Sequence, residues 1–412
     1  NESIVSGNDK VGGIIGENKS GKTVSNVVNA TSVTGATKGN DISEYVGGLV
    51  GVNSGSVTNG RNNGTIAGTN YVGGLVGDNA DEHSILTNLV NDSSAEILGV
   101  EYVGGIAGKN RGTITADREN NNLINRGSIT GHKYVGGVAG LNVGTITNTN
   151  IDVELKVNNA VSGDHQYFGG IVGQNGDDKN EGTIENATNS NKIVAPNASY
   201  VGGIVGWNTQ KGKLIGMGNS NEGEVIGGSY VGGVIGKNDA SIGSNNAAQV
   251  GIKNEGVVIA TNGGAGGLIG ENNAAITNTI MTNKGEVHGN NSNDGSGTGG
   301  LIGTNSGAIS YSSMTNEVTG TVTGVYNVGG LIGVNKADIT GGRDTVNDKD
   351  SGYYLNKIYN NGVINVGNYT DADKDGKYEF AASNGQNIGG LFGTNSGKVE
   401  AAYNTGAINA SG

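Results

Sequence analysis

Cysteine is absent from this chain of 412 residues, proline and tryptophan occur once each, and aromatic residues make up only 5%. Without cysteine the chain can form neither disulfide bonds nor thiolate metal sites, although this does not fix the compartment. A composition so poor in aromatic residues, with 80 glycines, argues against ordinary globular domains.

Positive charge is also scarce, since the formal net charge is −12. An acidic surface without a Lys/Arg cluster repels nucleic acid and anionic membranes, so we expect no nucleic-acid partner. No apolar run approaches the roughly 20 residues of a membrane-spanning helix, so we expect no membrane insertion. The chain starts at Asn1 without a signal peptide, which we interpret as a mature or excised piece of a secreted or surface protein.

The residues that are abundant indicate a thin core. Hydrophobic residues reach 34%, and Val, Ile and Leu recur along the whole chain. A disordered Gly/Ser linker would lack these aliphatic residues, and collagen would place glycine at every third position. The chain therefore buries one or two aliphatic side chains at regular intervals.

An internal repeat explains this pattern. Tyr-Val-Gly-Gly-Leu-Val-Gly-x-Asn occurs at residues 45–53 and again at 71–79. Each of twelve copies keeps a glycine four residues after the first glycine of the pair, and an asparagine two residues later. The Gly-Gly pairs begin at Gly12, Gly47, Gly73, Gly104, Gly136, Gly169, Gly202, Gly232, Gly266, Gly299, Gly329 and Gly389.

Aliphatic residues within each copy alternate with small polar residues over four to six positions, and Gly and Asn bound these runs. This pattern is typical of short strands and turns. We therefore predict an all-β fold, a β-solenoid (β-helix or β-roll) of about twelve coils with roughly three short strands per coil of about 31 residues. It forms one continuous domain over residues 1–412, with a long loop insertion at about 341–386.

One feature leaves two interpretations open. Both positions after each Gly-Gly pair are apolar, as in Leu49 and Val50, although neighbouring strand residues face opposite sides. Either the glycine pair bends the strand, which we favour, or the strand has apolar contacts on both faces and covers a partner.

These residues resemble a known family. The core Gly-Gly-Leu-Val-Gly-x-Asn-x-Gly-x-Ile, seen at residues 47–57 with Val57 in the last position, is similar to the GLUG repeat of large bacterial surface proteins. Such proteins include adhesins and the non-catalytic parts of some immunoglobulin A peptidases. The resemblance covers essentially the whole chain, except the 60-residue interval between Gly329 and Gly389. It implies secretion to the bacterial cell surface and a stalk, adhesion or matrix role, without a defined active site.

A candidate metal site lies in the insertion. Asp371, Asp373 and Asp375 alternate before a glycine, as in the first half of an EF-hand calcium loop, and Glu379 follows. Ala382 stands at the twelfth position, where such a loop has a bidentate glutamate. The two interpretations are a weak Ca²⁺ site and a solvated acidic loop.

Tyrosines form the second candidate site. A stack that shields one corner of the solenoid is the favoured interpretation, and a stripe that binds sugar or protein is the alternative. Tyr353 and Tyr354 lie in the insertion beside the Asp-rich loop, where they suggest a calcium-dependent glycan site. Tyrosine precedes Val-Gly-Gly or its equivalent in seven consecutive copies, at Tyr45, Tyr71, Tyr102, Tyr134, Tyr167, Tyr200 and Tyr230.

Motifs of catalysis are weak, so we predict that the protein is not an enzyme. Gly21-Lys22-Thr23 lacks the upstream glycine of a phosphate-binding loop. The four histidines, His83, His132, His165 and His288, are scattered along the sequence.

The leading functional prediction is a stiff stalk or adhesive surface whose partner is a host-surface or matrix glycan or protein. The alternative is an extracellular filament in which copies stack end to end through uncapped solenoid ends, because unpaired strand edges can pair further. A β-helix enzyme that acts on polysaccharide is the third possibility.

Overall fold

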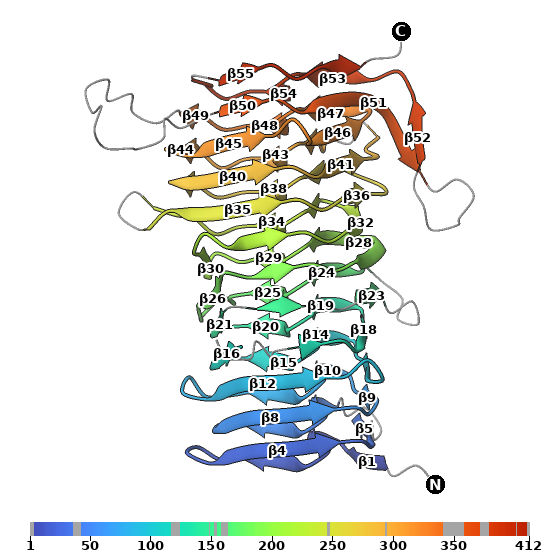
Figure 1. Cartoon of the computed structure of the whole chain (residues 1–412), viewed down its shortest axis with the longest axis vertical. Helices are drawn as coiled ribbons and strands as arrows, with labels where there is room; N and C mark the ends of the chain where they lie inside the picture. Colours follow the sequence, from blue (N-terminus) through green and yellow to red (C-terminus); the bar gives the residue numbers. More distant parts are fainter. Residues whose placement is uncertain are drawn as a thin grey trace.

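The fold was described from a computed structural model, which describes residues 4–35, 43–116, 124–147, 149–151, 155–157, 164–244, 248–292, 295–340, 358–370, 379–400 and 402–409. All regular elements among these residues are β-strands, and nearly all pair in parallel. Figure 1 shows them stacked along one long axis, with the N-terminus at one end and the C-terminus at the other. In this described part, no helix has the length and apolar character needed to cross a membrane. The predicted all-β solenoid is confirmed.

The strand after each Gly-Gly pair belongs to one sheet of twelve strands. Identical motif positions pair from coil to coil, for example Asn53 with Asn79 and Asn79 with Asn110. The strands are β3 (Ile15–Asn18), β7 (Val50–Asn53), β11 (Val76–Asn79), β15 (Ala107–Asn110), β20 (Ala139–Asn142), β25 (Val172–Asn175), β29 (Val205–Asn208), β34 (Ile235–Asn238), β38 (Ile269–Asn272), β43 (Ile302–Asn305), β48 (Ile332–Asn335) and β54 (Phe392–Asn395).

A second sheet contains two strand positions of each coil, which we call the approach strands and the tyrosine strands. The approach strands are β1 (Ile4–Gly7), β5 (Ser32–Gly35), β9 (Ile66–Ala67), β13 (Glu96–Leu98), β18 (Ser128–Gly131), β23 (Leu155–Val157), β28 (Ile193–Gly202), β32 (Val225–Ser229), β36 (Val258–Ala260), β41 (Glu286–Gly289), β46 (Thr321–Gly324), β51 (Val363–Thr370) and β56 (Ile408–Asn409). The tyrosine strands are β2 (Asp9–Gly12), β6 (Glu44–Gly47), β10 (Asn70–Gly73), β14 (Glu101–Gly104), β19 (Lys133–Gly136), β24 (Gln166–Gly169), the end of β28, β33 (Val231–Gly232), β37 (Ala265–Gly266), β42 (Thr298–Gly299), β47 (Tyr326–Gly329) and β53 (Gln386–Gly389).

The remaining face is divided among three smaller sheets. One holds β4 (Thr23–Asn29), β8 (Ser56–Asn62), β12 (Ile85–Asn91), β16 (Thr113–Thr115), β17 (Ile124–Asn125), β21 (Thr145–Thr147), β26 (Gly182–Glu185) and β30 (Gly212–Ile215). Another holds β22 (Asn150–Ile151), β27 (Thr188–Asn189), β31 (Asn219–Asn221), β35 (Val250–Asn254), β40 (Thr279–Asn283), β45 (Ser313–Asn316), β50 (Ile358–Asn360) and β55 (Ala402–Asn404). The third holds β39 (Ile276–Thr277), β44 (Ile309–Ser310) and β49 (Ile339–Thr340).

The prediction of about twelve equivalent coils with three strands each is only approximately met, because the coils differ in their strands. The sheet after the Gly-Gly pairs and the second sheet both run unbroken along the stack, whereas the third face is split into sheets of eight, eight and three strands. A well-defined coil holds four strands, as in β6, β7, β8 and β9. The extra strand arises because a bend separates the tyrosine strand from the strand that follows it.

Glycine causes that bend. The backbone turns at Gly48 and Leu49, and the side chains of Leu49 and Val50 are both fully buried. A Cβ atom on Gly48 would lie 2.2 Å from the carbonyl oxygen of Gly74 in the next coil, so only glycine fits. The bend interpretation is therefore confirmed, and the paired apolar residues belong to the solenoid core.

Two columns of buried asparagines run beside this core. In each column the Nδ2 group of one asparagine donates to the Oδ1 atom of its equivalent in the next coil, over 2.7–3.0 Å. The first column is the repeat asparagine, from Asn18 to Asn395. The second runs from Asn29 to Asn125 and from Asn189 to Asn404 among the described residues. Amide ladders of this kind hold successive coils in one register.

The predicted insertion at 341–386 contains strands where the structure describes it. Within that range, β50 and the first half of β51 pair with the solenoid, so they continue the coils. The second half of β51 leaves the sheet and pairs antiparallel with β52 (Glu379–Ala382). Figure 1 shows β52 running along the outside of the stack. Residues 341–357 and 371–378 lie outside the described residues, so the loop insertion stays a prediction there, while the described residues of the range form strands.

Candidate binding face

The seven predicted tyrosines form one continuous stack, which we call the tyrosine ladder. Neighbouring rings from Tyr45 to Tyr230 have centroids 4.6–5.3 Å apart and are inclined by only 5–13°. Their faces therefore cover one another, and a ligand along this ladder would meet ring edges and hydroxyl groups.

Each tyrosine of the ladder occupies a strained backbone conformation that the sequence did not indicate. Their φ angles are 51–64°, in the left-handed region, which a bulky residue seldom adopts. Lys10, Asn327 and Asn387 share this conformation at the same position of other coils. The strand register pairs Glu44 with Asn70 and Val46 with Val72, and skips Tyr45 and Tyr71 on both strands. The left-handed residue is therefore a kink that recurs at the same position of successive coils.

A glycine of the adjacent coil makes room for this kink. A Cβ atom on Gly77 would lie 2.4 Å from the carbonyl carbon of Tyr45, so the third glycine of the repeat is required by this contact. Strain of this kind costs about 1–3 kcal/mol per residue and persists only where the surrounding structure supports it. Ring stacking, worth about 0.5–1.5 kcal/mol for each pair, offsets part of this cost.

Burial makes the hydroxyl groups of several ladder tyrosines harder to ionise. Burial raises the pKa of Tyr45 and of Tyr167 to about 12, with nearby acidic groups such as Glu44 adding to the effect at Tyr45. Burial raises the pKa of Tyr71, Tyr102 and Tyr134 as well. At neutral pH the ladder therefore offers neutral hydroxyls that can donate and accept hydrogen bonds.

A second column of side chains lies beside the ladder, from the variable position before each repeat asparagine. It contains Asp78, Lys109, Leu141, Gln174, Trp207, Lys237 and Glu271, which pair in sequence along the twelve-stranded sheet. We call it the flanking column. The ammonium group of Lys109 lies 5.6 Å from the ring centroid of Tyr71 and 4.0 Å from the carboxylate of Asp78. Lys109, Trp207 and Lys237 of this column each contact the tyrosine of the preceding coil.

Trp207, the single tryptophan of the chain, adds a second aromatic ring beside the ladder. Its indole ring stacks on Tyr167 with centroids 4.9 Å apart, and its Nε1 donates to Asp239 over 2.7 Å. The ammonium group of Lys237 lies 5.4 Å from the rings of both Tyr200 and Trp207. These contacts combine aromatic faces with donors and a carboxylate, which suits a polar ligand that also has an apolar face.

The predicted calcium ligands and the insertion tyrosines are only partly described. Asp371, Asp373 and Asp375 lie outside the described residues, as do Tyr353 and Tyr354. Glu379 is the first residue of β52, where it pairs with Thr370. Within the described ranges, no group of three or more His, Asp or Glu side chains is placed to hold a metal ion. The calcium-dependent site stays a prediction.

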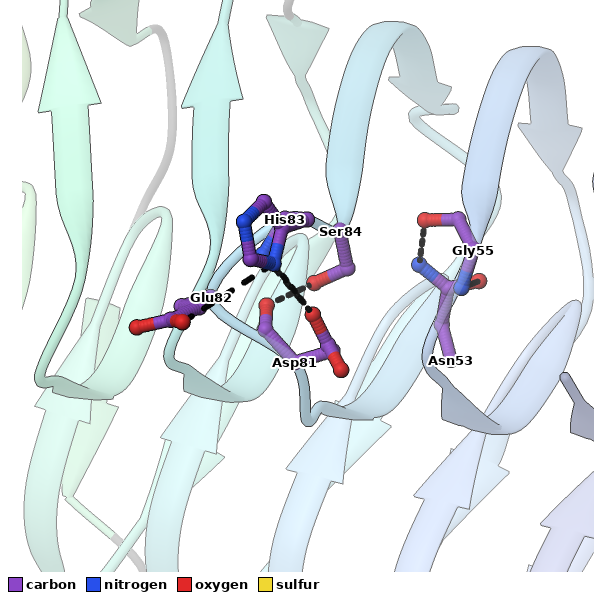
Figure 2. A network of polar contacts seen from close by, with 6 residues as sticks. All are labelled: Asn53, Gly55, Asp81, Glu82, His83 and Ser84. Atoms are coloured by element: carbon purple, nitrogen blue, oxygen red, sulfur yellow. Dashed lines mark hydrogen bonds and ion pairs between the residues drawn. The ribbon is translucent and has the colours of Figure 1, made fainter. Parts of the chain in front are cut away.

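A second polar cluster near the N-terminal end contains the residue types of a hydrolase triad in a different arrangement. Figure 2 shows Asp81, Glu82, His83 and Ser84 in the turn before β12. The Ser84 hydroxyl donates to the backbone carbonyl of Asp81, while the Asp81 carboxylate accepts from the backbone N–H and approaches the ring of His83. Serine and histidine are therefore not linked, and the cluster stabilises a turn.

One pair of histidines was missed in the sequence. The Nδ1 atoms of His132 and His165 lie 2.8 Å apart, although 33 residues separate them. Both stand two residues before a ladder tyrosine, Tyr134 or Tyr167. The repeat register could have revealed this pair, because equal positions in adjacent coils become neighbours.

The parallel coils in register define a β-solenoid repeat protein. The model of the GLUG motif matches residues 164–194, the segment from the end of the loop before β24 into β28. A search of curated protein sequences and a search of solved structures each found no match. Residues 164–194 thus carry a GLUG motif, as the resemblance implied, and the fold and motif together fit a repeat region of a surface protein.

Proposed function

We propose that this protein is a stiff, non-catalytic spacer of a secreted or surface-attached bacterial protein, and that its tyrosine face binds a host-surface or matrix partner. The observation that carries the proposal is the unbroken twelve-stranded sheet with its asparagine column. A spacer has to resist bending, and a continuous hydrogen-bonded ladder along the axis provides that resistance.

The adhesive part of the proposal depends on the tyrosine ladder and its flanking column. A ligand that extends along the axis would meet the same hydroxyl edge at each coil, spaced by about 4.8 Å. Repeated weak contacts of this kind add up for a long ligand such as a glycan chain or an extended peptide. The cluster around Trp207 supplies the strongest local contact.

The shape can be tested by electron microscopy of the purified chain over a concentration series. Discrete rods at every concentration support a spacer, with a length near 55 Å from twelve strands about 4.8 Å apart. Filaments that lengthen with concentration would replace this proposal with the end-to-end alternative.

Binding can be tested on arrays of glycans and matrix proteins. The double variant Trp207→Ala/Lys237→Ala should lose at least tenfold in affinity for any ligand that the parent chain binds. Tyr311→Ala is a matched control, because Tyr311 is exposed and lies near β44, away from the ladder. Equal loss in the control, or no loss in the double variant, would show that this face is not the binding site.

Two further expectations complete the proposal. The Asp371–Asp375 segment with Glu379 would bind Ca²⁺ weakly, so Asp373→Asn should abolish a heat signal in calorimetric titration with millimolar calcium.

The chain should show no turnover on a panel of polysaccharides. Product formation that is lost on removal of one carboxylate pair would overturn the non-catalytic assignment.

A further inference from the structure

The His132–His165 pair joins the ends of two adjacent tyrosine strands. Lys133 pairs with Gln166 in the register of β19 and β24, so the preceding histidines are cross-strand neighbours. Their ring centroids lie 4.5 Å apart, and the ring planes cross at 76°. Both side chains are half-buried, which leaves one side of the pair open to solvent.

Two Nδ1 atoms at 2.8 Å share one proton at most. One ring must donate N–H while the other presents its lone pair, since two protonated nitrogens would repel. A metal ion can replace that proton and use both lone pairs, as neutral imidazole is a common metal ligand. If the two rings pointed straight at each other through their Nδ1 atoms, their centroids would lie farther apart than the observed 4.5 Å. The lone pairs are therefore inclined to the line between the two nitrogens.

The spacing selects among metals. Two nitrogens each about 2.0 Å from one ion lie about 2.8 Å apart when they subtend a right angle, and about 3.3 Å apart at the tetrahedral angle. The observed 2.8 Å therefore fits neighbouring corners of a square-planar or tetragonal site. Copper(II) and nickel(II) favour that geometry, and copper(II) binds nitrogen ligands most strongly among the divalent first-row ions.

The surroundings keep the pair ready to bind. The carboxylates of Glu101 and Asp164 are close enough to act electrostatically on the His132 ring, as is the ammonium group of Lys133. The two negative charges outnumber the one positive charge and favour a bound cation. The ammonium group of Lys133 is directed to the ring of Tyr134, 5.1 Å from its centroid.

We propose that His132 and His165 form a two-imidazole site for copper(II), with water in the remaining positions. The site does not depend on the adhesive role. It would place one metal ion on the outside of the solenoid, bridging two successive coils beside the tyrosine ladder.

The test is a titration of the full chain, prepared without a polyhistidine tag, with copper(II) in the presence of glycine as a weak competitor. Electron paramagnetic resonance should show one tetragonal copper per chain with coupling to two imidazole nitrogens. His132→Gln and His165→Gln should each weaken binding at least tenfold and remove the two-nitrogen pattern. Zinc(II) should bind more weakly than copper(II) by at least tenfold.

The matched controls are His83→Gln and His288→Gln, which change the other two histidines and should leave binding unchanged. Circular dichroism verifies that every variant keeps the β-solenoid. Copper that binds with the same affinity and spectrum in the His132 and His165 variants would overturn the proposal, as would a spectrum with coupling to one nitrogen.

Discussion

At the scale of single residues, the molecule repeats a few side-chain positions with different physical demands. The repeat asparagines need partners because their amides are buried, as at Asn142 and Asn175. The ladder tyrosines need stacking neighbours because their backbones are strained. The repeat glycines need space for backbone atoms, as Gly77 does for Tyr45 of the preceding coil. An adjacent coil takes part in meeting each of these demands.

The ladder should make the fold sensitive to alkali. Folding favours the neutral form of Tyr45 and Tyr167, whose pKa values rise from 10.0 to about 12. Their contribution is therefore fully present below pH 10 and is lost as the pH rises from 10 to 12. The melting temperature should fall across that window. In a pH titration followed by tyrosinate absorbance, part of the rise should occur above pH 10, which we call the late phase.

The Tyr45→Phe/Tyr167→Phe variant is the control for this prediction, since phenylalanine keeps the stack but cannot ionise. It should lose part of the late phase and melt at a less pH-dependent temperature. Complete titration of every tyrosine near pH 10 without loss of structure would contradict the expected burial.

The asparagine column should be weakest where a buried member is removed. Asn142→Ala deletes the bonds to Asn110 and Asn175 and leaves an amide donor and an acceptor unpaired in the core. We expect a loss of about 2–4 kcal/mol in the free energy of unfolding, measured by urea denaturation. Asn395→Ala, at the exposed end of the same column, should cost about 1 kcal/mol or less. Similar losses at both positions would mean that the column contributes little.

At the scale of elements, glycine placement decides where strands end. Gly136 closes β19, and a Cβ atom there would lie 2.1 Å from the carbonyl oxygen of Ala139 and 2.8 Å from the nitrogen of Gly173. The first atom belongs to its own coil and the second to the next. Both the bend within the coil and the close approach of the next coil therefore require that residue 136 has no Cβ atom.

Gly136→Ala should accordingly destabilise the coil by at least about 3 kcal/mol, because backbone atoms on both sides would have to move. Gly7→Ala is the matched control, since the nearest atom to its Cβ is a methyl group of Val11 at 3.2 Å. That change should stay within about 1 kcal/mol of the parent. Thermal melts followed by circular dichroism distinguish the two, and equal melting temperatures would refute the steric argument.

The 341–386 segment was predicted as a loop insertion because 60 residues separate Gly329 from Gly389. Among its described residues, Ile364 and Val366 alternate and are buried, as in an approach strand. Antiparallel pairing of β51 with β52 could not be anticipated, because nothing in the repeat specifies a strand that leaves the stack.

At the scale of the whole molecule, each coil contacts mainly its neighbours, so stability is close to a sum over coils. A chain shortened to residues 1–340 should remain folded, because the tyrosine ladder and the first eleven repeat asparagines lie within it. Its near-ultraviolet dichroism should keep the signal of the stacked tyrosines, with a modest fall in melting temperature. Complete loss of that signal would show that the C-terminal coils are needed for the rest to fold.

The sequence by itself determined the solenoid and the repeat positions of glycine and asparagine, because these follow from residue types that recur at one position of a periodic chain. It favoured the glycine bend, which the structure decided, and it did not indicate the second asparagine column. It also indicated the tyrosine ladder, although it did not indicate the left-handed backbone that carries it. Only the tertiary structure decided which side chains of different positions meet, such as Trp207 with Tyr167, or His132 with His165 through their Nδ1 atoms. These contacts depend on the offset between successive coils and on rotamers, and neither quantity is specified by a repeat spacing.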